Sequence, residues 1–254
     1  MSDVHSNPRA LAAALADARR LGCARFVMLG DVTGYGYDAP GALKAVKESF
    51  DIVLMGNHDS ACIGREPYLD TVLNRNYSID VAQRSTLSEE DMAWLRERPF
   101  RAEEGCCAFV HGDFTRPQAW RYVFNDDDAK RCLDAESARI LFCGHTHHAA
   151  VWQETGRGGL RRKLAKALLK FVEAPETRRL HIPANGRMVV NVGSVGYPRN
   201  DLCSSYAIYD DAAERIDLRR LPFDFKAYID DMTSAGVDLP AWLVTLLLKA
   251  RDIP

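Results

Sequence analysis

The chain has 254 residues, 47% of them hydrophobic, and a net charge of −2. This length and composition suit one α/β domain with a substantial core, spanning residues 1–254. The near-neutral charge disfavours nucleic acid as a partner. Seven cysteines without a Cys-x-x-Cys pair argue against a disulfide framework or a zinc knuckle. Because we find neither a signal peptide nor an apolar run of membrane-spanning length, the sequence predicts a cytoplasmic protein with no membrane role.

Helical and extended patterns alternate along the chain. Asn7 and Pro8 are the N-cap and first residue of a helix that Gly22 ends. Apolar runs predict buried strands at 25–29, 51–55, 106–110 and 139–143. Helices are predicted at 40–48, within 66–98 and at 125–133. Later strands are predicted at 149–154, 178–183, 187–192, 205–210 and 215–221, and closing helices at about 224–234 and 240–251.

Each of the first four strands leads into a motif of metal-ligand residue types, and a fifth motif opens the chain. The five motifs are Asp3-Val4-His5, Gly30-Asp31, Gly56-Asn57-His58-Asp59, His111-Gly112 and Gly144-His145-Thr146-His147. A single Gly-Asp is usually a turn, and a single histidine is usually a core residue. Strand ends that share one sheet edge form one crevice, however, so we expect these side chains to meet there. The set therefore predicts a site for two metal ions.

The spacing within the motifs suggests individual roles. Residues two apart in an extended segment project to the same side, so Asp3 can act with His5, and His145 with His147. Asp31 is the natural carboxylate to bridge two ions held about 3.5–4 Å apart. Oxygen and imidazole ligands without cysteine suit Mn²⁺ or Fe²⁺, with Zn²⁺, Co²⁺ or Ni²⁺ also possible.

The ordered series of motifs resembles the calcineurin-like metallophosphoesterase superfamily. The resemblance implies a four-layer αββα sandwich of two mixed sheets flanked by helices, with a binuclear metal site at the strand ends. It implies that one ion is held by Asp3, His5, Asp31 and His147, and the second by Asp31, Asn57, His111 and His145. His58 would protonate the leaving oxygen or stabilise the charge of the transition state.

Two further stretches, 30–36 and 191–199, resemble the small prokaryotic phosphodiesterase-like branch. That branch includes cyclic-nucleotide-type phosphodiesterases, phosphatases and some hydrolases of diadenosine polyphosphates. The Ser/Thr protein phosphatases differ, because they carry Asp-Arg-Gly after Gly-Asp where this chain has Thr33-Gly34-Tyr35. The family has a full apolar strand before Asp-x-His, whereas only Met1 and Ser2 precede Asp3 here. We therefore expect that strand to be truncated or the sheet to lack its central member.

The expected activity is hydrolysis of a phosphodiester or nucleotide by a metal-bridged hydroxide, with a small phosphorylated or nucleotide substrate as the partner. The alternatives are a catalytically retired scaffold, a phosphomonoesterase and a nuclease. The oligomeric state stays open. Arg199 is a candidate for gripping a phosphate and Tyr35 for stacking on a base, as are Tyr37, Phe114 and Trp120.

Residues 157–174 combine leucines at helical spacing with several Arg and Lys side chains. This pattern predicts a basic helical insertion. Its cations form either a solvated face or a cap over the metal site that suits a polyphosphate or nucleotide.

Overall fold

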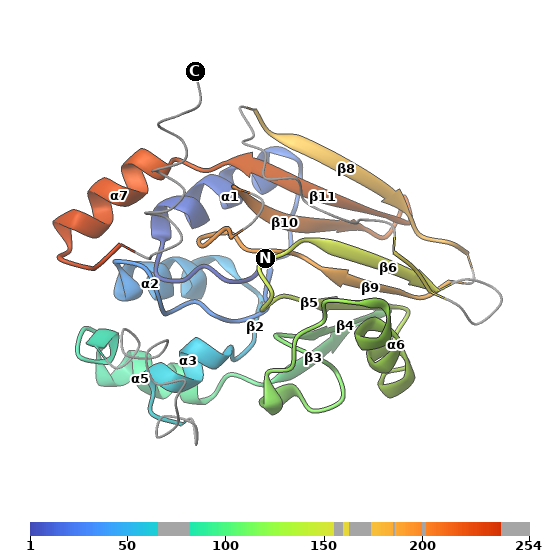
Figure 1. The fold of residues 1–254 in the computed structure, drawn as a ribbon, viewed down its shortest axis with the longest axis horizontal. Helices are drawn as coiled ribbons and strands as arrows, with labels where there is room; N and C mark the ends of the chain where they lie inside the picture. Colours follow the sequence, from blue (N-terminus) through green and yellow to red (C-terminus); the bar gives the residue numbers. More distant parts are fainter. Residues whose placement is uncertain (66–81, 155–159, 163–173, 185, 200–201, 240–254) are drawn as a thin grey trace.

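The computed structural model describes residues 1–65, 82–154, 160–162, 174–184, 186–199 and 202–239 (Figure 1). Helices and several sheets alternate in it, so the mixed α/β class predicted from the sequence is confirmed. Among the described residues, no helix is both long and apolar enough to cross a membrane.

The larger sheet has six strands in the order β3-β4-β5-β9-β6-β7. Their bounds are β3 Arg101–Glu104, β4 Cys107–Val110, β5 Ile140–Cys143, β6 Ala150–Glu154, β7 Leu160–Arg162 and β9 Met188–Asn191. The central strands β4, β5 and β9 are parallel, while β3 and β6 flank them in antiparallel orientation. The carboxyl ends of β4 and β5 thus lie at one edge, where the predicted His111 and Gly144–His147 motifs follow.

The second sheet layer consists of two pieces. β1 (Val27–Met28) pairs in parallel with β2 (Ile52–Val53). β10 (Cys203–Asp210) and β8 (Glu176–His181) each pair antiparallel with β11 (Arg215–Pro222). The N-terminal residues connect the pieces through the loop before β10. The Met1 nitrogen donates to the Val27 carbonyl at 2.9 Å, and the Val195 N–H donates to the Ser2 carbonyl at 3.0 Å. The same loop joins β10, because the Ser205 N–H donates to the Ser194 carbonyl at 2.8 Å. Residues 1–3 therefore lie between the two pieces without forming a regular strand.

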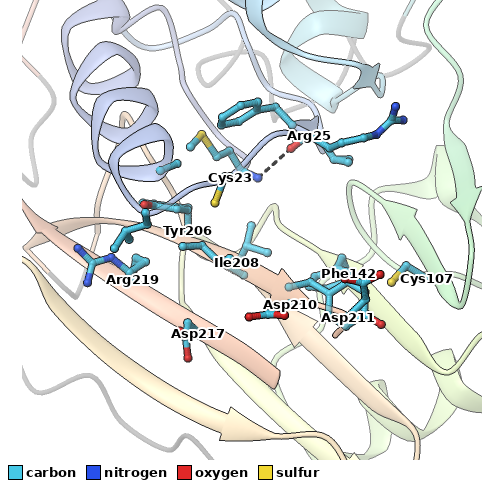
Figure 2. A pocket seen from close by; sticks show the side chains of 18 of the residues that line it. Cys23, Arg25, Cys107, Phe142, Tyr206, Ile208, Asp210, Asp211, Asp217 and Arg219 are labelled. Atoms are coloured by element: carbon cyan, nitrogen blue, oxygen red, sulfur yellow. Dashed lines mark hydrogen bonds between the residues drawn. The ribbon is translucent and has the colours of Figure 1, made fainter. Parts of the chain in front are cut away.

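A cavity of about 870 Å³ lies where the second layer is divided (Figure 2). One side is formed by the residues before and in β1, including Cys23 and Arg25, and the other by Tyr206 and Ile208 of β10. None of the predicted metal ligands lines it. This cavity is therefore separate from the predicted metal site.

Three apolar clusters show that the layers are stacked as expected. Side chains of β4 alternate, so that Cys107 and Phe109 pack between the two sheet layers while Ala108 and Val110 pack against α6 (Asp126–Ala135). The outer face of the second layer is covered by α1 (Pro8–Arg20), α2 (Ala39–Ser49) and α5 (Glu89–Arg96). The order helix, sheet, sheet, helix is the predicted αββα sandwich.

Further helices are α3 (Asn57–Cys62), the short 3₁₀ turn η1 (Pro117–Ala119) and α7 (Phe225–Ser234). Asn7 caps α1 as predicted, since its side chain accepts a hydrogen bond from the Ala10 N–H. Strand β3 was not predicted, because its run Arg101–Glu104 is polar and mostly exposed.

The helical prediction for 157–174 is wrong at residues 160–162. These residues form β7, which pairs antiparallel with β6 and so satisfies backbone groups along the β6 edge. The rest of the segment except residue 174, together with the predicted helix at 240–251 and residues 66–81 of the helical stretch 66–98, lies outside the described residues.

Candidate metal centre

The structure brings all seven predicted metal ligands into one buried cluster. They come from the chain start, the loop after β1, the start of α3, the end of β4 and the loop after β5. The seven side chains are Asp3, His5, Asp31, Asn57, His111, His145 and His147, and each is at most 7% exposed.

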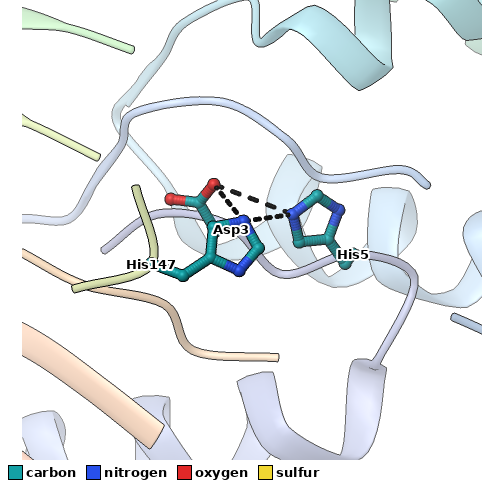
Figure 3. A group of neighbouring side chains, drawn as sticks. All are labelled: Asp3, His5 and His147. Atoms are coloured by element: carbon teal, nitrogen blue, oxygen red, sulfur yellow. Dashed lines mark hydrogen bonds and ion pairs between the residues drawn. The ribbon is translucent and has the colours of Figure 1, made fainter. Parts of the chain in front are cut away.

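Three of these side chains form the first half of the cluster. Figure 3 shows Asp3, His5 and His147 pointing toward one another. The His147 Nε2 atom lies 3.1 Å from His5 Nε2 and 3.3 Å from Asp3 Oδ1. The distance from His5 Nε2 to Asp3 Oδ1 is 3.7 Å. Three potential ligand atoms thus surround one small volume.

The second half is centred on His111. Its Nε2 atom lies 3.0 Å from Asn57 Oδ1, 3.2 Å from His145 Nδ1 and 3.2 Å from Asp31 Oδ2. Asp31 also faces the first half, since its Oδ2 atom is 3.7 Å from His5 Nε2. Asp31 is therefore placed between the two halves, as the bridging role requires.

Outer hydrogen bonds orient every ring in the cluster. The Nδ1 atoms of His5, His111 and His147 lie within 2.7–3.1 Å of the carbonyl oxygens of Thr33, Leu29 and Tyr197, and His145 Nε2 lies 2.8 Å from the Trp120 carbonyl. A carbonyl can only accept, so each of these nitrogens carries the proton. In the neutral form of each ring, the opposite nitrogen points its lone pair into the cluster, which is the usual arrangement around metal-ligating histidines.

The donor set fits a cation at each half. The Nε2 atoms of His5 and His147 lie 3.1 Å apart, and in the neutral rings their lone pairs face each other. This arrangement is unfavourable unless a cation lies between the two nitrogens. Asp3 Oδ1 and Asp31 Oδ2 are buried and have no hydrogen-bond partner among the described residues. The other oxygen of each carboxylate accepts a backbone N–H, from His145 and His58 respectively. Buried anionic oxygens of this kind call for a metal ion.

Burial and the charges of the cluster shift several pKa values, and all of these shifts except that of His111 favour ligation. Burial lowers the pKa of His5 and of His145 to about 3, so both rings are neutral at pH 7. Burial alone would raise the pKa of Asp31, but His111 and His58 hold it well below its usual range. Burial would likewise lower the pKa of His111, yet the charge of Asp31 outweighs it and raises that pKa to about 9.

We therefore expect the His111 ring of the metal-free protein to carry a second proton, on Nε2, at pH 7.5. A metal ion must displace that proton, so metal affinity should rise with pH and level off above about pH 9. The check is a ¹H–¹³C NMR titration of the ring in metal-free protein, assigned with His111→Gln, alongside Mn²⁺ affinities at several pH values. A ring that is already neutral at pH 7.5, or an affinity independent of pH, would contradict this prediction.

The backbone at the cluster is unusual. Asp3, His5, Asp31, His145 and His147 all have positive φ, between 49° and 66°. The prediction that each Asp-x-His or His-x-His pair is extended is therefore wrong, although the side chains still converge. Left-handed backbone is unfavourable for residues other than glycine and persists where the surroundings enforce it, most often at functional sites.

Close loop packing provides part of that enforcement. Gly30 has φ of 107°, and a Cβ atom there would lie 2.6 Å from the Gly56 nitrogen. The loops that carry Asp31 and Asn57 can thus approach each other this closely only because residue 30 is a glycine, which has no side chain. Asp59 ties the same loops, since it accepts hydrogen bonds from the Thr33 N–H at 2.9 Å and the Gly56 N–H at 3.1 Å.

The stretch 191–199 supports the cluster from the other side. Asn191 donates to the Gly144 carbonyl at 2.8 Å, and the Ser194 hydroxyl donates to the Asp3 carbonyl at 2.9 Å. Tyr197 supplies the carbonyl that holds His147. These positioning contacts were not predicted individually, although the sequence singled out the stretch.

The three other predicted site residues border the first half of the cluster. His58 lies with its ring centroid 4.9 Å from that of His5 and 4.3 Å from that of Tyr35. Tyr35 stacks on Tyr197 at 4.4 Å. Arg199 lies over the Tyr197 ring at 6.0 Å, and its charge contributes to lowering the pKa of His147, of which burial is the larger cause. All three are thus near the cluster.

Comparisons with known proteins agree with this geometry. Residues 1–213 match the model of the calcineurin-like phosphoesterase superfamily domain. The crystal structure of a metallophosphoesterase from Sphaerobacter thermophilus is similar, with 31% sequence identity, a TM-score of 0.78 and coverage of 96% of this chain and 95% of that chain. An uncharacterised protein of Methanocaldococcus jannaschii is 28% identical over 259 residues, which cover 99% of this chain and 97% of its own.

Proposed function

Because the chain belongs to the calcineurin-like phosphoesterase superfamily, we propose that it is a metal-dependent hydrolase of phosphodiester or nucleotide substrates. The observation that carries the proposal is the pairing of two ligand groups, Asp3-His5-His147 and Asp31-His111-His145, with Asp31 facing both. An arrangement of this kind suits two ions close enough to act on one phosphate.

The proposed ligands divide between the two ions as the geometry suggests. Asp3, His5 and His147 would hold one ion, and Asn57, His111 and His145 the other, with Asp31 shared. The mixed oxygen and nitrogen donors favour Mn²⁺ or Fe²⁺, and Zn²⁺, Co²⁺ or Ni²⁺ are also compatible. When bound, the two ions supply Lewis-acid polarisation of the phosphoryl oxygens and a nucleophilic water near neutral pH.

The protein's own groups would complete the reaction. His58 borders the first ligand group and is proposed to protonate the leaving oxygen. Arg199 is proposed to bind a phosphate oxygen that does not react, because its charge is close enough to contribute to lowering the pKa of His147. Tyr35 closes that side of the site through its stack on Tyr197 and is proposed to contact the substrate.

The second candidate is a retired scaffold that binds without hydrolysing. The intact set of donors disfavours this candidate. A protein without catalytic activity would not be expected to keep seven converging ligands or five ligand residues with positive φ.

A panel of esters with Mn²⁺ tests the proposal. The panel consists of bis-p-nitrophenyl phosphate, p-nitrophenyl phosphate, cyclic nucleotides and dinucleoside polyphosphates. We expect metal-dependent turnover that chelation abolishes, and faster turnover of diesters and nucleotides than of p-nitrophenyl phosphate. A metal-loaded protein that hydrolyses none of them would support the scaffold, and a preference for the monoester would favour a phosphomonoesterase.

A further inference from the structure

Two exposed aromatic side chains lie beside the second ligand group. Tyr122 is 43% exposed and Phe124 is 44% exposed. Within the described residues, the one other large hydrophobic side chain with comparable exposure is Leu21, at the end of α1. Two of the three thus fall in one short loop, next to the metal cluster.

The two rings form a continuous strip that starts at a metal ligand. Tyr122 stacks on His145 with ring centroids 4.2 Å apart and an interplanar angle of 7°. Phe124 follows at 5.0 Å from Tyr122, and the ring of His148 lies 6.1 Å from that of Phe124. We call Tyr122, Phe124 and His148 the aromatic strip.

The loop holds the strip in place from both ends. At one end, the Trp120 carbonyl accepts a hydrogen bond from the His145 Nε2–H at 2.8 Å. At the other, the Phe124 N–H donates to the Asp128 carboxylate at 3.0 Å, at the capped start of α6. Between them Val123 is 2% exposed and packs with α6, so the alternation turns Tyr122 and Phe124 outward. The exposure is therefore built into the loop.

The strip and Arg199 border different ends of the cluster. Tyr35 and Tyr197 contact the ring of His5 in the first ligand group, and Arg199 lies over the Tyr197 ring. The strip contacts His145, in the other group. A phosphate bound between the groups would thus have a cationic side chain at one end and an aromatic surface at the other.

We propose that the aromatic strip binds a nucleobase attached to the phosphate that is hydrolysed. The inference rests on the proposed function, since it places that phosphate at the metal cluster. A base offers a planar face to each exposed ring, and stacking of this kind is tolerant of base identity. The strip therefore favours nucleotide substrates over small phosphate esters without selecting one base.

The test compares two esters with the same leaving group. Thymidine 5′-p-nitrophenyl phosphate carries a base, whereas methyl p-nitrophenyl phosphate does not, and both release p-nitrophenolate. For Tyr122→Leu and Phe124→Leu, we expect the KM ratio of thymidine to methyl ester to rise at least about fivefold over that of the unaltered protein. Any disturbance of His145 affects both esters and cancels in the ratio.

Two control variants test whether the aromatic rings themselves are needed. Tyr122→Phe keeps a ring and should have the same KM ratio of thymidine to methyl ester as the unaltered protein. Leu21→Ala, at the exposed end of α1, should also leave this ratio unchanged. Binding of thymidine 5′-monophosphate and 2-deoxyribose 5-phosphate to Mn²⁺-loaded protein gives a readout independent of turnover. The base should strengthen binding to the unaltered protein and lose most of that effect in the leucine variants.

The outcomes are distinguishable from failure of the proposed function. If neither ester is hydrolysed, the proposed function fails and the binding comparison alone decides the inference. If both are hydrolysed and the ratio stays constant across the variants, the strip does not bind a base. A strip that instead buries itself in a self-associated protein, seen as a larger sedimentation coefficient lost in Phe124→Leu, would also overturn the inference.

Discussion

Asp31→Asn is expected to abolish phosphoesterase activity and to reduce bound metal from two ions to one or none. The substitution preserves size and keeps an oxygen to accept the His58 N–H. It removes the negative charge of Oδ2, the atom that faces both His5 and His111. Two-metal catalysis contributes several kcal/mol, so kcat should fall at least about a thousandfold. Elemental analysis of the metal and initial rates with bis-p-nitrophenyl phosphate provide the measurements.

Asp217→Asn is the matched control for this substitution. Asp217 is also buried, but it lies on β11 and pairs with Arg179 at 2.9 Å, away from the cluster. We expect that variant to keep two ions and most of its activity, with some loss of stability. Two ions at full occupancy in Asp31→Asn would show that Asp31 does not bridge them.

The convergence of the ligands was predictable because it follows from local patterns and one topological rule. The runs before His111 and His145 are short and apolar, and they form the adjacent parallel strands β4 and β5. Parallel strands end at the same edge, so whatever follows them meets there. Asp31 and Asn57 follow the adjacent parallel strands β1 and β2 of the second layer, so they meet at the edge of that layer for the same reason.

The supports of the cluster were not predictable in this way. The left-handed backbone of Asp3 and His5 depends on contacts with Gly30, Asp31 and residues 194–196, which are distant in sequence. The exposure of Tyr122 and Phe124 depends on which side of the loop Val123 buries, and no motif marks it. Leu160–Arg162 lies in a segment whose leucines have helical spacing, yet pairing with β6 overrides that local preference.

His58 offers two interpretations, which its geometry separates into different experimental outcomes. Its ring is not part of either proposed ion's ligand set, but a nitrogen of His58 lies within 4.8 Å of ligand atoms of His5 and Asp31. It either acts on the leaving oxygen, by donating a proton or by stabilising charge, or is a further metal ligand. The helix start that carries it is fixed by its own N–H, which donates to Asp31 Oδ1 at 2.9 Å, so substitution of the ring should not displace the loop.

We expect His58→Ala to retain two bound ions and to lose about 10²–10⁴ in kcat for substrates with poor leaving groups. Esters of p-nitrophenol should lose much less, because p-nitrophenolate leaves without being protonated. The measurement is a plot of log kcat against leaving-group pKa for a series of aryl and alkyl diesters, with metal content determined in parallel. His181→Ala, on the exposed strand β8, is the control and should follow the line of the unaltered protein. A slope unchanged by His58→Ala would mean that the ring stabilises charge rather than donating a proton, and a drop in metal content would make it a ligand.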